Sequence, residues 1–132
     1  MSNNNTVAML FNLSGKVAIV TGGAGQLGGE YVRTFLDAGA SVAAWDMRLD
    51  NPKGGLDDLN SDRLLKVQVD ITDRKSIEAA TEQVAKTLGV PGILINNAAL
   101  DAPPNATEQE TGPFETYPEA SLDAMMDVNL KG

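Results

Sequence analysis

The composition of this 132-residue chain excludes several classes of protein before any motif is considered. The chain has neither cysteine nor histidine, which removes disulfides, thiolate metal sites and Ser-His-Asp triads. Its formal charge of −8 opposes contact with nucleic-acid phosphates and anionic membrane surfaces, and no apolar run approaches the roughly 18 residues of a membrane span. We therefore expect a globular, cytoplasmic protein with no metal, no nucleic-acid partner and no membrane partner.

The first part of the chain predicts an arm, a strand and a helix. Residues 1–14, with three consecutive Asn residues, are typical of a flexible N-terminal arm. Residues 16–20 (K-V-A-I-V) form an apolar, β-branched run that predicts a strand buried on both faces. Apolar positions at helical spacing follow over 27–38, and Gly39 stands where a helix usually stops.

The alternation of strand and helix continues after this first unit. Short apolar runs predict strands over 41–45, 64–69 and 92–95. Between the last two, an apolar stripe over 77–88 predicts a helix, and Asp73 before it is a good cap residue.

Two polar segments interrupt this pattern. Residues 51–60 are rich in Gly and Asp and predict a loop with a short helix. Residues 101–117 form a Pro-rich stretch that is too long for a routine connection and is hence a candidate functional loop. A final helix is expected to begin near Pro118 and to continue to the end of the chain.

Strands that alternate with helices across short turns predict an α/β fold with a doubly wound parallel sheet of the Rossmann type. We expect this domain to occupy residues 15–132. Ligands bind such sheets at the carboxyl ends of the strands.

A glycine-rich motif lies between the first strand and the first helix. The residues T-G-G-A-G-Q-L-G occupy positions 21–28, and Gly23, Gly25 and Gly28 satisfy the pattern G-x-G-x-x-G. Such a loop lets backbone N–H groups and a helix N-terminus approach a pyrophosphate without obstruction by side chains. A tight strand-to-helix turn that requires positive φ is the alternative interpretation.

An acidic residue follows at the expected distance. Asp46 ends the second strand, 18 positions after Gly28, close to the spacing of about 20 residues at which a carboxylate binds the adenosine ribose. The same carboxylate would repel a 2′-phosphate, which favours NAD over NADP, although Arg48 two positions later weakens this preference. A solvated Asp at a strand end remains the alternative.

These residues resemble the short-chain dehydrogenase/reductase family over 15–132. The family places an Asp after the third strand, where Asp70 and Ile71 look like the pair that flanks the adenine; a helix-capping turn is the alternative role for Asp70. The family also has an N-N-A-G stretch after the fourth strand, and N-N-A-A stands here at 96–99. The resemblance implies that this stretch lines the cofactor and braces the sheet, whereas a simple Asn turn is the alternative.

The end of the chain, D-V-N-L-K-G from 127 to 132, is similar to the family's helix that carries a catalytic Asn, which falls on Asn129. Helical spacing places Asn129 on the same apolar face as Leu122 and Met126, so we expect it to point inward. The resemblance implies that this residue holds a water in a proton relay and keeps the helix kinked. A buried structural Asn is the alternative.

The chain departs from the family in three ways. Gln26 occupies the position of the middle glycine of the common loop, and Ala99 replaces a glycine. The family's Tyr-x-x-x-Lys pair is missing, because neither Tyr31 nor Tyr117 is followed by Lys four positions later. We therefore expect the domain to be incomplete relative to the family, truncated after the helix that follows the fourth strand, and to lack the Ser, Tyr and Lys of the site.

The resemblance thus implies that the parent protein is an NAD(H)-dependent oxidoreductase that transfers a hydride between a nicotinamide and a small alcohol or carbonyl substrate, with this chain alone expected to be inactive. A binding module for NAD without turnover is the alternative. If these residues are the whole polypeptide, the fourth strand left at the sheet edge predicts a dimer formed through that edge or through the final helix. The resemblance implies a homo-oligomer, either a dimer or a tetramer, for the parent protein. The candidate catalytic residue is Asn129, and the candidate cofactor-binding residues are Gly22, Gly23, Gly25, Gln26, Leu27, Gly28, Asp46, Asp70, Ile71, Asn97, Ala98 and Ala99.

Overall fold

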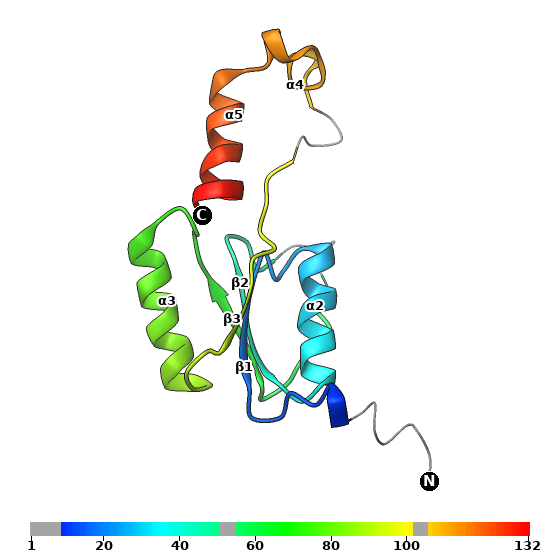
Figure 1. The fold of residues 1–132 in the computed structure, drawn as a ribbon, viewed down its shortest axis with the longest axis vertical. Helices are drawn as coiled ribbons and strands as arrows, with labels where there is room; N and C mark the ends of the chain where they lie inside the picture. Colours follow the sequence, from blue (N-terminus) through cyan, green and yellow to red (C-terminus); the bar gives the residue numbers. More distant parts are fainter. Residues whose placement is uncertain (1–8, 51–54, 102–105) are drawn as a thin grey trace.

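A four-stranded parallel sheet forms the centre of the molecule (Figure 1). The computed structural model describes residues 9–50, 55–101 and 106–132. The strand order is β3-β2-β1-β4, which confirms the predicted doubly wound sheet. Each strand end lies within one residue of its predicted position; the strands are β1 (Val17–Thr21), β2 (Ser41–Asp46), β3 (Leu64–Gln68) and β4 (Ile93–Ile95).

Two helices cover opposite faces of this sheet (Figure 1). Helix α2 (Gln26–Asp37) buries one apolar cluster and α3 (Arg74–Thr87) buries another, because successive strand side chains point to opposite faces. The α2 side contains Val20, Val32, Leu36, Val42 and Ala44. The α3 side contains Ile19, Ala43, Trp45, Val67, Ala80 and Val84.

The parallel register brings the carboxyl ends of the strands to one edge of the sheet. Thr21 at the end of β1 pairs with Trp45 of β2, and Val20 pairs with Ile95 at the end of β4. The segments that leave these strands therefore emerge side by side, and they are the segments that carry the predicted site residues.

Strand β4 is the outer strand of the described sheet, as the sequence predicts. It pairs with β1 on one side, and Leu94 is 56% exposed. An apolar strand at an edge offers unpaired backbone groups to another chain or segment. The homo-oligomer inferred from this edge stays a prediction.

The two polar segments, 51–60 and 101–117, contain turns and short helical elements. Residues 55–58 form turns, whereas residues 51–54, where part of the expected short helix falls, lie outside the described part. The described part of the 101–117 stretch contains α4 (Glu108–Thr111) and η1 (Phe114–Thr116), whereas residues 102–105 lie outside the described part. A capping box between Thr107 and Glu110 starts α4, and the T-x-x-E pattern in the sequence is its signal.

The final helix begins where the sequence predicts, but it does not stay α-helical. Helix α5 (Glu119–Met126) follows Pro118, and the chain continues as the π-helical segment η2 (Asp127–Lys131). These elements lie beyond the carboxyl ends of the strands (Figure 1). Among the described residues, no helix is both long enough and apolar enough to cross a membrane.

Candidate functional site

The glycine loop between β1 and α2 is constrained by its own packing. Gly22 has a φ of +63°, which favours glycine. A β-carbon on Gly28 would overlap the carbonyl oxygen of Gly22, and one on Gly23 would lie 2.9 Å from the β-carbon of Ala44. The tight-turn interpretation therefore accounts for these three glycines without any ligand. A binding function has to be judged from the polar groups around the loop.

The first of these polar groups is the N-terminus of α2. Its cap residue is Gly25, which supplies no side-chain hydrogen bond, and the first helical bond runs from Gly29 N–H to the carbonyl of Gly25 at 2.9 Å. The N–H groups of Gln26, Leu27 and Gly28 therefore have no partner within the helix. With no acidic side chain in this first turn, the helix end favours an anion.

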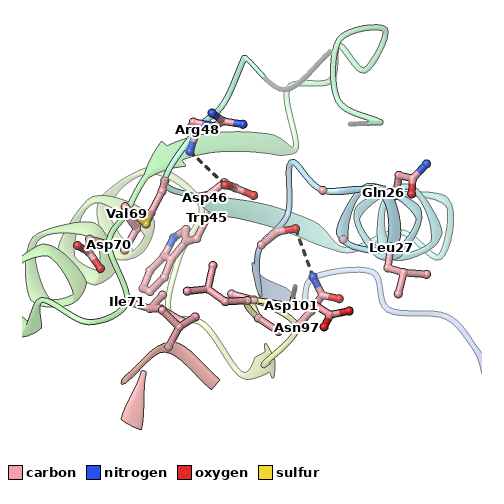
Figure 2. Close-up of a pocket in the computed structure, with 18 residues that line it drawn as sticks. Gln26, Leu27, Trp45, Asp46, Arg48, Val69, Asp70, Ile71, Asn97 and Asp101 are labelled. Atoms are coloured by element: carbon pink, nitrogen blue, oxygen red, sulfur yellow. Dashed lines mark hydrogen bonds between the residues drawn. The ribbon is translucent and has the colours of Figure 1, made fainter. Parts of the chain in front are cut away.

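Asp46 lies directly beside the glycine loop. Its Oδ2 accepts a hydrogen bond from Ala24 N–H at 3.1 Å. Its Oδ1 accepts one from Arg48 N–H at 3.1 Å (Figure 2). The loop is also tied to the strand through Gly23 N–H, which donates to the carbonyl of Trp45 at 2.9 Å. Asp46 is thus not merely a solvated residue at a strand end.

A second set of hydrogen bonds joins the end of β4 to the loop. The buried hydroxyl of Thr21 accepts from the N–H groups of Asn97 and Ala98, both at 3.0 Å, and donates to the carbonyl of Ile95 at 3.3 Å. The side-chain amide of Asn97 in turn donates to the carbonyls of Thr21 at 2.9 Å and Gly22 at 3.2 Å. Asn97 therefore braces the loop, whereas sequence analysis missed the role of Thr21.

Asp70 is held in the turn between β3 and α3. Its Oδ1 accepts from the hydroxyl of Thr72 at 2.6 Å and from Thr72 N–H at 2.8 Å. These two bonds, the hydroxyl first, lower the pKa of Asp70 below its ordinary value, because they stabilise the charged carboxylate. Asp70 therefore stabilises this turn, as its alternative interpretation predicts. It also lines a cleft at the ends of the strands.

The loop, the strand ends and the β3–α3 turn enclose one cleft of about 770 Å³. It extends from the first turn of α2, with Gln26 and Leu27, past Asp46 to the turn with Asp70 and Ile71 (Figure 2). Every predicted cofactor-binding residue lines it except Gly23, which is buried on the side of the loop that packs against Ala44. The cleft also has lining residues that sequence analysis did not select: Trp45, Met47, Arg48, Val69, Leu100, Asp101 and Val128.

Asn129 is not placed as the helical spacing predicted. It is exposed, and so are Leu122 and Met126, at 38% and 42%. The prediction of an inward position was wrong because α5 and η2 lie beyond the ends of the strands and not against the sheet, so the whole face that carries Leu122, Met126 and Asn129 is exposed. The amide instead pairs with the backbone of Leu100, accepting from its N–H at 2.7 Å and donating to its carbonyl at 2.9 Å. Val128, next to it, lines the cleft.

Neither tyrosine of the chain contributes to the cleft. Tyr31 lies on α2 and is 40% exposed, and the hydroxyl of Tyr117 donates to the sulfur of Met125 at 3.2 Å. Within the described ranges, no group of three or more acidic side chains is arranged to hold a metal ion.

A doubly wound sheet with a glycine loop, a bare helix N-terminus and a carboxylate at the end of β2 defines the dinucleotide-binding class of α/β folds. Within that class, the family model described as short chain dehydrogenase matches residues 16–132. The chain therefore belongs to the short-chain dehydrogenase/reductase family.

Individual relatives agree with this assignment. The chain is 34% identical to the NAD-dependent glycerol dehydrogenase of Listeria innocua over 122 residues, which cover 92% of this chain and 44% of that protein. A 3-ketoacyl-(acyl-carrier-protein) reductase from Brucella melitensis, solved with NADH, has a TM-score of 0.74 and 28% identity over 91% of this chain and 46% of its own. A short chain dehydrogenase from Leptospira borgpetersenii with bound NAD+ has a TM-score of 0.74 and 27% identity over 99% of this chain and 44% of its own. The chain thus spans less than half the length of these three relatives.

Replacement of Thr21 by valine tests the hydroxyl that joins β1 to the end of β4. Valine keeps the shape but leaves two N–H groups without their acceptor, so we expect a loss of about 2 kcal/mol in the free energy of unfolding. Urea denaturation measures this loss. Thr34→Val, at an exposed threonine of α2, is the control and should change stability by less than about 0.5 kcal/mol. Equal stabilities of the two variants would contradict the bracing role.

Proposed function

We propose that this chain forms the cofactor-binding part of an NAD(H)-dependent oxidoreductase that acts on an alcohol or carbonyl substrate. One observation carries the proposal: the bare N-terminus of α2 and the carboxylate of Asp46 face the same cleft. The first suits a pyrophosphate and the second suits ribose hydroxyls. When bound, a nicotinamide cofactor supplies or accepts the hydride. The names of the NAD-dependent and NAD-bound relatives support the same cofactor.

The two ends of the cleft have different proposed tasks. At the α2 end, the N–H groups of Gln26 and Leu27 hold the pyrophosphate, while the lack of side chains at Gly22, Gly25 and Gly28 keeps the approach open. The absence of a side chain at Gly23 serves the packing beneath the loop.

At the other end, Asp46 binds the adenosine ribose, and Asp70 and Ile71 flank the adenine. The segment after β4, with Asn97, Ala98 and Ala99, lies across the loop and is proposed to line the nicotinamide ribose. Asn129 is proposed to support the chemical step from its position next to Leu100.

Binding of NAD+ by the 132-residue chain tests the proposal, and two glycine variants make the test specific. In Gly28→Ala the added methyl group displaces the loop from the helix N-terminus, so we expect the Kd to rise about tenfold or more. In Gly92→Ala the added methyl group meets nothing within 4 Å, and the Kd should stay within about twofold. Isothermal titration calorimetry measures both. A wild-type chain that does not bind NAD+ would contradict the proposed function.

The preference for NAD over NADP is tested at Asp46. Asp46→Ala removes the ribose contact that favours NAD and also the negative charge that opposes a 2′-phosphate. We therefore expect the Kd for NAD+ to rise more than the Kd for NADP+, measured by the same titration. Asp62→Ala, at an exposed aspartate outside the cleft, is the control for net charge. Equal losses for the two cofactors would count against the ribose assignment.

A second candidate function is NAD binding without turnover, and the placement of the tyrosines favours it for these 132 residues. Because neither Tyr31 nor Tyr117 lines the cleft, we expect no turnover by this chain. Incubation with NAD+ and a panel of secondary alcohols, followed by the absorbance of the reduced nicotinamide, measures this directly. Formation of reduced cofactor would show that the described site is sufficient without a Tyr-x-x-x-Lys pair.

A further inference from the structure

The carboxylate of Asp46, which is proposed to bind the cofactor's ribose, also accepts hydrogen bonds from the backbone of the protein. Both of its oxygens accept backbone N–H groups, Oδ2 from Ala24 in the glycine loop and Oδ1 from Arg48. A carboxylate has about four lone-pair sites, so two remain for ribose hydroxyls. The contact with the loop and the contact with a ribose are therefore compatible.

The Ala24 N–H group depends on this contact. Ala24 is 1% exposed, so water cannot replace a lost hydrogen-bond acceptor without movement of the loop. Its neighbours are already engaged, since Gly23 N–H donates to Trp45 and Gly25 N–H donates to Gly22. The carboxylate of Asp46 thus holds the middle of the loop to the end of β2.

The position of Ala24 matters for the anion site because Gly25, the next residue, caps α2. A shift of the loop at Ala24 moves the N–H groups of Gln26 and Leu27, which are the proposed pyrophosphate ligands. A displacement of about 1 Å at such donors is enough to weaken their hydrogen bonds markedly.

We infer that Asp46 is a positioning residue for the glycine loop as well as a ribose contact, so that one carboxylate couples pyrophosphate binding to ribose binding. This inference rests on the proposed function. It implies that a 2′-phosphate beside Asp46 acts in two ways: its charge repels the Asp46 carboxylate, and it also displaces the glycine loop that this carboxylate holds. It also implies that Asp46 contributes to the binding of ligands that have no ribose hydroxyls.

The test uses a ligand that separates the two roles. 2′,3′-Dideoxy-ADP has the adenine and the pyrophosphate but offers no hydroxyl to Asp46, whereas ADP offers both hydroxyls. If Asp46 positions the loop, Asp46→Ala raises the Kd for dideoxy-ADP about fivefold. If Asp46 acts only through the ribose, this Kd does not change, and the inference is overturned.

Further variants separate the loss of the hydrogen-bond acceptor at position 46 from other effects of the substitution. Asp46→Asn keeps an acceptor oxygen for Ala24 N–H and should restore the Kd for dideoxy-ADP to within about twofold of the wild type. Asp62→Ala should have no effect on this Kd. Should Asp46→Ala fail to fold, Asp46→Ser, which lacks the carboxylate oxygen that accepts from Ala24 N–H, carries the same expectation.

Hydrogen exchange of the Ala24 amide, followed by NMR without ligand, gives a readout that does not depend on binding. Exchange should be faster in Asp46→Ala than in the wild type and slow again in Asp46→Asn; equal rates in all three would also overturn the inference. Failure of the proposed function is recognised separately, because the wild-type chain would then bind neither ADP nor NAD+.

Discussion

The hydrogen bonds around the hydroxyl of Thr21 join three parts of the site. This hydroxyl is buried at the end of β1, accepts from two N–H groups of the segment after β4, and donates to the last carbonyl of β4. Because it is enclosed, each bond is electrostatically stronger than in water, and each partner left alone would carry the full cost of desolvation. The side chain of Asn97 extends the same network to the carbonyl of Gly22. The floor of the cleft is therefore built by the exits of β1 and β4 together.

The anion site follows from a packing constraint on this frame. The loop must turn sharply between β1 and α2, and the close contact between Gly28 and the carbonyl of Gly22 leaves no room for side chains. Glycine at the cap position then leaves α2 without a side-chain partner for its first N–H groups. A turn required by the fold thus creates a bare helix end at the mouth of the cleft. The carboxylate of Asp46, which is bonded to Ala24, supplies the second polar group at this edge.

The sequence correctly predicted the features that depend on local patterns of residues. It did not predict the features that depend on contacts between residues far apart in the chain. Strand positions followed from short apolar runs, and the position of Asp46 beside the glycine loop followed from its place at the end of the second strand, whereas its role toward a cofactor stays a prediction. The role of Thr21 was missed because it depends on the register of β1 against β4, although a polar residue at the end of a buried strand was a usable signal. The exposure of Asn129 was missed because helical spacing indicates which residues share a face but not what that face packs against, and the face with Leu122 and Met126 packs against nothing that buries it in the described structure.

The side chain of Asn129 connects η2 to the segment after β4 at one wall of the cleft. Its amide satisfies both backbone groups of Leu100, so it attaches η2 to the segment after β4 with two bonds at one residue. The same segment places Val128 in the cleft wall and brings Gly132 so close to Ile71 that a β-carbon on the glycine would lie 2.8 Å from the isoleucine side chain. These bonds are exposed, and hydrogen bonds of this kind contribute only about 1 kcal/mol each. The wall beside Val128 is therefore held less firmly than the floor, where the Thr21 network is buried and a lost partner cannot be replaced by water.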